Sequence, residues 1–333
     1  MLSTMLFHFN KFRKIYEKVM CYALVFLITP GFYIFELTVV RPSVVKIYKM
    51  CAIEEMFHIV CSTFCFINVV GNMIMSIFTD TSLKTSTVGD SYCDFCKSSR
   101  PAKTWHCNGC NTCILRRDHH CFFFSRCIGL YNQRYYVSYL GYIFISMVYS
   151  TYYNYCYVAA KFDDHGFAIS AFRIINPLLR YLIPEPLGMK DMCVFFIFLN
   201  VGLTIWSGFL FWFHMGNVLR GVTSHEYRYS GGIDKNMWKE NLSRVFGVKW
   251  YWALLWPFAD SPLPKKMERT QTSYSRPSRT LKYGKSSNWP VAGLGSFQDA
   301  GHPCQALVQL YIDCDVYEKA RILSNDVTSV FYL

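Results

Sequence analysis

Four long runs of apolar residues, set apart by segments rich in polar and basic side chains, dominate the sequence. They extend from Val19 to Val40, from Met56 to Phe78, from Tyr136 to Val158 and from Met192 to Met215. A helix needs about 20 mostly apolar residues to cross the hydrocarbon core of a bilayer. The pattern therefore predicts an α-helical polytopic membrane protein with four transmembrane helices.

Two other interpretations of these runs are weaker. Core helices of a soluble domain would not need the basic flanks that accompany the runs. A cleaved signal peptide would have an apolar region of about 7–15 residues and a small-residue cleavage site, whereas the first run is longer and contains Pro30, Gly31 and Glu36. Composition agrees with a membrane protein: 17% of the residues are charged and 52% are hydrophobic, against about 25% charged in typical soluble domains.

The placement of Lys and Arg sets the expected orientation. The net charge is +12, and basic residues concentrate before the first run, between the second and third runs, and after the fourth. Cytosolic loops of membrane proteins carry an excess of Lys and Arg. We therefore expect both termini and the segment between the second and third runs to be cytosolic. This pattern accounts for the charge, so no nucleic-acid partner is expected.

The segment between the second and third runs carries the most informative chemistry. Seven cysteines and three histidines lie between Cys93 and Cys127. Two tetrahedral zinc sites would use eight such ligands, which leaves one cysteine and one histidine. A histidine beside a free cysteine can activate the thiol as a nucleophile. In a reducing compartment, clustered thiols are more often metal ligands than disulfides.

Ligand spacing indicates how two sites would share this segment. Cys93 and Cys96 form one CxxC knuckle, and Cys107 and Cys110 form another, each able to hold two corners of a tetrahedron. Cys113 forms an overlapping CxxC with Cys110, so adjacent ligands are expected to serve different metal ions. No internal repeat is evident in the sequence.

A carboxylate, two imidazoles and a thiol follow in four consecutive positions, Asp118, His119, His120 and Cys121. A nearby imidazole favours the thiolate form of a cysteine. A carboxylate can fix the tautomer of that imidazole and stabilise its charged form. Spacing alone leaves open which histidine binds metal and which cysteine stays free.

The segment from Cys93 to Tyr136 resembles the cysteine-rich domain of the DHHC protein S-acyltransferases, or palmitoyltransferases. Thr223, Ser224 and Glu226 look like the family's Thr-Thr-x-Glu element, and Asn241 looks like the asparagine of its C-terminal motif. With the four-span topology, the resemblance covers about residues 1–258. The matching residues within the cysteine-rich segment are Arg100, Pro101, His106, Cys107, Cys110, Cys113, Asp118, His119, His120, Cys121, Cys127, Ile128, Gly129 and Asn132.

The resemblance implies a two-step acyl transfer. A fatty acyl group would pass from acyl-CoA to Cys121, and then to cysteines of cytosolic or membrane proteins near the bilayer. His119 would act as the base and Asp118 would orient it. Two structural zinc ions are implied as well, one bound by Cys93, Cys96, His106 and Cys113, and the other by Cys107, Cys110, His120 and Cys127. Because the family works mostly on endoplasmic reticulum and Golgi membranes, one of these is the expected location.

Beside the proposed nucleophile the sequence departs from the family pattern. Phe122 and Phe123 stand where the family has Pro-Trp, Arg126 replaces the usual Asn, and Ser224 replaces the second Thr. Aromatic rings bury a large area and suit the membrane interface. We therefore expect Phe122 and Phe123 to bind substrate as the cytosolic end of an acyl-chain cavity.

These predictions divide the chain into five parts. They are transmembrane helices one and two in 1–80, the zinc-binding domain in 81–135, helices three and four with a luminal loop in 136–216, a cytosolic motif region in 217–258, and a disordered cytosolic tail in 259–333. Basic residues of the tail could contact anionic lipid headgroups, although a solvated tail explains them equally well. The alternative functions are a catalytically silent membrane zinc scaffold and a membrane-anchored RING-like ubiquitin ligase. Ligases of that class, however, have no unspent cysteine beside a histidine.

Overall fold

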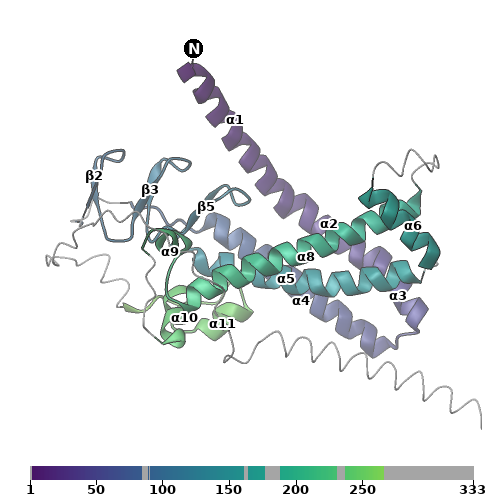
Figure 1. Cartoon of the computed structure of the whole chain (residues 1–333). Coiled ribbons are helices and arrows are strands. Elements are labelled where there is room, and N and C mark those ends of the chain that lie inside the picture. The colour runs from purple at the N-terminus through teal and green to yellow at the C-terminus, as the bar shows by residue number, and fades with distance from the viewer. Residues whose placement is uncertain are drawn as a thin grey trace, which may run out of the picture. The chain divides into compact units, whose positions relative to one another are not determined.

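Long helices and a small domain of paired strands make up the part of the chain that the structure describes (Figure 1). The structure is a computed structural model, and it describes residues 2–84, 89, 91–160, 164–176, 188–230 and 237–265. Most of the predicted tail, 259–333, lies outside the described residues, including the whole of 301–333.

Within the described residues, three helical stretches are long and apolar enough to cross a membrane: Phe12–Tyr48, Ala52–Phe78 and Asp191–Leu219. They contain the first, second and fourth of the predicted runs. The first stretch passes without a break through α1 (Leu2–Ala23), η1 (Leu24–Ile28), α2 (Thr29–Phe35), η2 (Glu36–Val40) and α3 (Arg41–Tyr48). The second is α4 (Ala52–Phe78), and the third belongs to α8 (Met189–Leu219).

Two prolines shape the first stretch. Pro30 follows the π-helical turn η1, and Pro42 follows the π-helical turn η2. A proline ring clashes with the carbonyl group four residues earlier and removes one backbone hydrogen bond. The wider π turn accommodates this change, so the helix continues past each proline.

The third predicted run lies in α5 (Gln133–Ala159), which has 27 residues, as many as α4. Tyrosines, serines and Asn154 make this helix less apolar, and it is not one of the three stretches above. α5 packs against both α4 and α8. Its passage through a membrane, and so the count of four transmembrane helices, stays a prediction.

Two Gly–Phe contacts bring α5 and α8 close together. A Cβ atom added to Gly208 of α8 would lie 2.7 Å from the ring of Phe144 in α5. One added to Gly141 of α5 would lie 3.0 Å from the ring of Phe211 in α8. Small residues allow helix backbones to approach closely when packed in a membrane.

Polar side chains join the first stretch to α5 and α8. The Ser150 hydroxyl and the Asn154 amide donate hydrogen bonds to Glu36 Oε1 at 2.7 and 2.6 Å. Asn200 of α8 donates to the Ser150 oxygen at 2.9 Å. Since a polar group among apolar helices is costly unless it is hydrogen-bonded, these bonds favour one relative orientation of the three helices.

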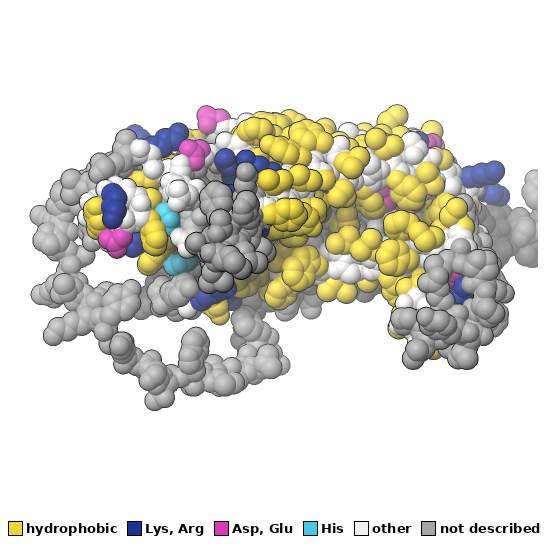
Figure 2. Space-filling view, turned by 90° about the horizontal axis from the view of Figure 1, so that it is seen from above, with side chains coloured by type: hydrophobic (Ala, Val, Ile, Leu, Met, Phe, Trp, Pro, Cys, Tyr) yellow, Lys and Arg dark blue, Asp and Glu magenta, His cyan; other side chains and the backbone are white. Residues whose placement is uncertain are grey.

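Hydrophobic side chains cover much of the face of the helical part seen in Figure 2. On α8, Ile205, Trp206, Phe209 and Trp212 are all exposed. Contiguous apolar surface of this kind is uncommon on soluble monomers. It suits contact with lipid.

Three two-stranded antiparallel hairpins follow α4. Their strands are β1 (Ser91–Cys93) with β2 (Ser98–Arg100), β3 (Trp105–Cys107) with β4 (Thr112–Ile114), and β5 (His119–Cys121) with β6 (Arg126–Ile128). The hairpins recur every 14 residues, and the first strand of each ends on a cysteine. At the equivalent turn positions Lys97, Asn111 and Ser125, φ is 51°, 55° and 52°.

The expectation of no internal repeat was therefore wrong. It failed because the outer hairpins differ from the middle one at the metal-binding positions. Tyr92 and Ser99 of the first hairpin stand where the other two have His and Cys, and Phe124 of the last hairpin stands where the other two have a second knuckle cysteine. Only the backbone makes the repeat plain.

Four further helices complete the described chain. A helix over 164–175, α6 (Asp164–Ile175), was not anticipated in the predicted luminal loop, and it packs on α8. After α8 come α9 (Ser224–Ser230), α10 (Trp238–Phe246) and α11 (Trp250–Leu255). α10 packs against α8 and α5, which brings the predicted C-terminal motif region back to the helices beside the hairpins.

Asn132 joins the last hairpin to the helices on either side of the hairpin domain. Its Oδ1 accepts a hydrogen bond from the Gly129 amide at 2.8 Å. Its Nδ2 donates to the carbonyl oxygens of Ser76 in α4, at 3.2 Å, and of Cys127 in β6, at 3.0 Å. The whole residue is buried.

We expect Asn132→Ala to destabilise the protein, because it leaves one buried amide and two carbonyl groups without these partners. Each such loss costs about 1–3 kcal/mol. Thermal unfolding of the detergent-solubilised protein should shift several degrees lower, whereas Asn108→Ala, which changes an exposed residue of the second hairpin, should leave it unchanged. Equal unfolding temperatures for the two variants would contradict this account.

Candidate metal and thiol site

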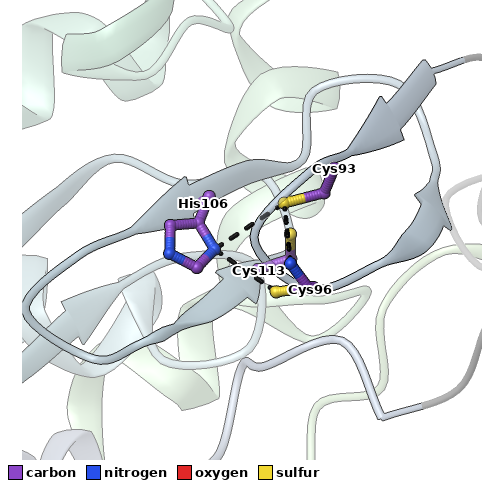
Figure 3. A group of neighbouring side chains, drawn as sticks. All are labelled: Cys93, Cys96, His106 and Cys113. Carbon is purple, nitrogen blue, oxygen red and sulfur yellow. Dashed lines mark hydrogen bonds between the residues drawn. The ribbon is translucent and has the colours of Figure 1, made fainter.

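Two cysteines of the first hairpin meet a histidine and a cysteine of the second (Figure 3). His106 Nδ1 lies 3.7 Å from Cys93 Sγ and 3.3 Å from Cys96 Sγ. Cys113 completes the group, whose four ligand atoms all lie within 4.8 Å of one another. These are the four residues that the family resemblance assigned to one zinc ion.

The second and third hairpins form a matching group. His120 Nδ1 lies 3.6 Å from Cys107 Sγ, 3.3 Å from Cys110 Sγ and 3.7 Å from Cys127 Sγ. Cys110 Sγ and Cys127 Sγ are 3.6 Å apart. The other four predicted ligands therefore lie together as well.

The donor atoms fit a metal ion in each group. Zinc binds sulfur at about 2.3 Å and imidazole nitrogen at about 2.0–2.1 Å, which at a tetrahedral angle separates the two ligand atoms by about 3.6 Å. The separations from each Nδ1 to the neighbouring sulfurs, 3.3–3.7 Å, are close to that value. Three sulfurs and one nitrogen without an open corner are typical of a structural zinc site.

The repeat explains why Cys121 belongs to neither group. Each group takes a CxxC knuckle from one hairpin and a His and a Cys from the next. Cys121 ends the first strand of the last hairpin, as Cys93 and Cys107 do in the first two. No fourth hairpin follows within the described residues, since α5 begins at Gln133. Cys121 thus occupies a ligand position of the repeat, but no following hairpin within the described residues supplies the His and Cys that would complete a metal site.

Cys121 lies in an apolar cluster where several helices meet. It is 7% exposed and packs in one cluster with Met73 of α4, Val137 of α5 and Val218 of α8. Phe124, which replaces the second knuckle cysteine, is buried in the same cluster. The thiol is therefore held against membrane-helix side chains rather than exposed on the hairpins.

On its polar side Cys121 adjoins His119. His119 Nδ1 lies 2.7 Å from Asp118 Oδ2, and its side chain also hydrogen-bonds with the Cys121 thiol. Burial alone would lower the pKa of His119, but these two partners outweigh it and raise the pKa to about 9. His119 thus lies between a carboxylate and a thiol, the order of groups in which an imidazole can act as a base toward a nucleophile.

Asp118 is a buried carboxylate with several partners. Burial would raise its pKa, but the hydrogen bond to His119, the neighbouring histidine charges and the Ser224 amide together keep that pKa below its usual value. The Ser224 amide donates to Asp118 Oδ1 at 2.5 Å and the Ser224 hydroxyl donates to Oδ2 at 3.2 Å. Asp118 is therefore an ionised carboxylate beside His119.

His214 and Tyr136 complete this group and were not anticipated from the sequence. His214 Nδ1 of α8 lies 3.5 Å from Asp118 Oδ2, and the Tyr136 hydroxyl of α5 lies 3.2 Å from His214 Nε2. The Tyr136 ring also packs edge-on against His119, at 5.0 Å between centroids. A lone histidine inside an apolar run offers no spacing signal toward a motif about 95 residues earlier, so sequence reasoning could not find it.

Of the predicted motif residues after α8, Ser224 contacts this carboxylate. Thr223 and Glu226 form a capping box at the start of α9, with the Thr223 amide 2.9 Å from Glu226 Oε2 and the Glu226 amide 3.1 Å from Thr223 Oγ1. This cap holds Ser224 against Asp118. Asn241 of α10 donates to the Leu219 carbonyl at the end of α8, at 2.9 Å.

Phe122 and Phe123 lie at the tip of the last hairpin. Phe122 contacts Tyr16 of α1, with ring centroids 5.7 Å apart, and Phe123 is 48% exposed. The fully buried aromatic of this loop is Phe124. The structure does not test whether the two phenylalanines bind substrate, so that role stays a prediction.

Comparison with known proteins agrees with this geometry. Residues 86–230 match the family model described as DHHC palmitoyltransferase. The chain carries a DHHC palmitoyltransferase domain. This DHHC domain spans the hairpins, the two metal-binding groups, α5, α8 and α9.

The similarity to individual relatives extends beyond the DHHC domain. "Probable palmitoyltransferase ZDHHC24" of Rattus norvegicus is 29% identical over 211 residues, which are 60% of this chain and 72% of the relative. "Palmitoyltransferase ZDHHC22" of Mus musculus is 30% identical over 161 residues, 47% of this chain and 60% of the relative. "Palmitoyltransferase pfa3" of Aspergillus fumigatus is 28% identical over 173 residues, 49% of this chain and 28% of the relative.

We expect the adjacent histidines to differ in their effect on metal content. His120→Ala removes one corner of the second group, so the purified protein should lose about one of two zinc ions per chain by elemental analysis and fold poorly. His119→Ala removes no member of either group and should retain both ions. Two zinc ions in both variants would show that His120 is not a ligand.

Proposed function

We propose that this chain is a protein S-palmitoyltransferase that moves a fatty acyl group from acyl-CoA, through an acyl-enzyme at Cys121, to cysteine thiols of cytosolic or membrane proteins. The observation that carries the proposal is that Cys121 is excluded from both metal groups and lies against His119 and Asp118. The names of the relatives favour this activity over a silent scaffold or a ubiquitin ligase.

In the first step, the Cys121 thiolate attacks the carbonyl carbon of acyl-CoA. The carbon–sulfur bond to CoA breaks and the new thioester forms on Cys121. The CoA sulfur takes up a proton, and CoA leaves as a thiol. His119 acts as the base toward Cys121 and then supplies the proton to the leaving sulfur. Asp118 holds the His119 ring through Nδ1, so that Nε2 is left for proton transfer.

The second step transfers the acyl group from Cys121 to a protein substrate. His119 accepts the proton of an incoming substrate thiol, whose sulfur attacks the Cys121 thioester. The acyl group moves to the substrate and the Cys121 thiolate returns. Each step exchanges one thioester for another and needs no oxidant or reductant.

His214 and Ser224 are positioning residues in this scheme. Ser224 contacts both carboxylate oxygens of Asp118, and His214 lies on the side of Asp118 toward α8. Together they compensate for burying the carboxylate. They keep Asp118 ionised and directed at His119.

Zinc is the metal that the two groups suit best, and bound zinc would fix the relative positions of successive hairpins. Cys93, Cys96, His106 and Cys113 would hold one ion, and Cys107, Cys110, His120 and Cys127 the other. Bound ions would keep the turn between His120 and Cys127 in one conformation, and the residues that transfer the acyl group would be Cys121 and His119.

The packing of α5 supports the proposed membrane arrangement with four transmembrane helices. This helix has spanning length and contacts α4 and α8, two of the apolar stretches. With four spans, the hairpins and both termini lie in the cytosol, and α6 lies on the luminal side. An endoplasmic reticulum or Golgi membrane is the proposed location.

A cavity beside the last hairpin offers an entry for acyl-CoA. It has a volume of about 480 Å³, and Arg13, Arg117 and Phe122 line it. Arg117 Nε is buried without a hydrogen-bond partner. Guanidinium groups bind phosphates well, so the proposal places the CoA phosphates there, with the thioester toward Cys121.

We expect an acyl-enzyme on Cys121. Purified protein incubated with labelled palmitoyl-CoA should carry a hydroxylamine-sensitive label. Cys121→Ser should lose that label with two zinc ions retained, and His119→Ala should reduce its rate of formation by at least about 100-fold, the usual scale of a general base. Equal labelling of wild type and Cys121→Ser would rule out this nucleophile.

Phe122 and Phe123 provide a test of chain-length preference. If they form the cytosolic end of the acyl cavity, changing both to Ala should slow acylation by long-chain acyl-CoA more than by short-chain acyl-CoA, because each buried CH₂ contributes about 0.8 kcal/mol. Phe172→Ala, an exposed aromatic on α6, is the control. A uniform loss across a chain-length series would mean that the pair only packs the loop.

A further inference from the structure

A buried carboxylate from the first helical stretch contacts the second metal-binding group. Glu17 of α1 is 3% exposed. Its Oε2 lies 3.2 Å from His120 Nε2, and its Oε1 lies 3.2 Å from Arg13 Nε, one turn earlier on the same helix. Glu17 lies outside residues 86–230, which match the DHHC family model.

The orientation of the His120 ring gives this contact its meaning. Nδ1 faces the sulfurs of Cys107, Cys110 and Cys127, so Nε2 is the nitrogen that points away from the metal position. A neutral imidazole that binds metal through Nδ1 carries its proton on Nε2 and can donate it. Metal-binding histidines usually donate this second N–H to a carboxylate, carbonyl or water, which fixes the ring and strengthens the ligand.

The two metal-binding groups differ in this respect. Among the described residues, the hydrogen bonds of His106 all go to Cys93 and Cys96, and its ring stacks on Phe95 at 4.8 Å between centroids. His120 has a carboxylate instead. Only the second group, the one next to Cys121, is tied to the helices through its histidine.

α1 contacts the residues on both sides of Cys121. Glu17 contacts His120 and Tyr16 packs on Phe122. Val25, about two turns further along in η1, lies in the apolar cluster that holds Cys121. The first helical stretch thus contacts the metal ligand before the thiol, the aromatic after it and the thiol's own surroundings.

We propose that Glu17 is the hydrogen-bond partner of the second metal site and, through His120, a positioning residue for Cys121. The first part needs only a metal ion in the second group. The second part rests on the proposed acyl transfer at Cys121. Arg13 pairs with Oε1 of the Glu17 carboxylate, which leaves Oε2 directed at the His120 ring.

The test uses Glu17→Gln in the full-length protein, since Gln preserves size but lacks the charge. Zinc release to a chromogenic chelator should show one of the two ions leaving about 10-fold faster or more, the usual effect of losing such a partner, with the other unchanged. In cadmium-loaded protein, one of two cadmium NMR resonances should shift. Glu240→Gln, the same change at an exposed residue of α10, should behave as wild type.

Acylation is the second measurement. Glu17→Gln should lower the rate constant for labelling Cys121 at saturating palmitoyl-CoA, because the thiol is displaced. Glu17 lines the same cavity as Arg13, so the comparison is made at saturation, where a change in CoA binding does not affect the rate. If wild type is never labelled, the acyl-transfer proposal fails while ion release still decides the metal contact. Unchanged release and resonances, or equal loss of both ions, would overturn the role of Glu17.

Discussion

The arrangement of the hairpin domain depends on the sharing of each metal group between two successive hairpins. A hairpin of two three-residue strands buries too little to be stable alone, and each metal ion would tie it to its neighbour through four bonds. The middle hairpin contributes to both groups, with Cys107 and Cys110 on one side and His106 and Cys113 on the other. The end hairpins contribute to one group each. In the last hairpin, Cys121 has no following hairpin with which to share a metal ion. The arrangement that holds the domain together therefore also leaves one thiol unbound.

The buried Asp118 links this domain to the helices. A carboxylate out of water is costly unless it is hydrogen-bonded and faces positive charge. Asp118 meets that requirement with His119 from its own hairpin, His214 from α8 and Ser224 from α9. Because these partners come from three separate elements, the hairpins can lie in only one position against α8 while the carboxylate is satisfied. The pair proposed to activate the thiol therefore also forms the contact that docks the domain.

Much of this could be predicted from the sequence, for identifiable reasons. A count of ten donors against eight ligand places already indicated one unspent Cys and one unspent His. Spacing alone did not say which residues these are, and the two ligand sets came from the family resemblance. Helices with strong, continuous apolar runs were found as well. α5 was the uncertain one, because its tyrosines and Asn154 weaken the apolar signal.

What the sequence could not supply are contacts between distant positions with no recurring spacing. Glu17 and His214 each lie inside or beside an apolar run, about 100 residues from the motif that they contact. Their role depends on which helix face turns toward the hairpins, and this is decided by the packing of the whole helical part. The repeat was missed for a related reason, since substitutions at its ends, such as Phe124, erase the pattern of residue types while the backbone retains it.

The location of Cys121 shows why a zinc-organised thiol would be combined with membrane helices. On one side the thiol has His119 and Asp118, which are polar and charged; on the other it has Met73, Val137 and Phe124. A fatty acyl thioester has the same two-sided character, with a polar reacting group on a long apolar chain. An apolar chain gains free energy by leaving water roughly in proportion to its buried area, so it would lie among the helices with the thioester at the polar side. A soluble zinc domain could hold the same ligands and the same triad, but it would offer no apolar surroundings for the acyl chain. In the proposed acyl transfer, the contacts of α1, α8 and α9 with the last hairpin would therefore be as necessary as the cysteine itself.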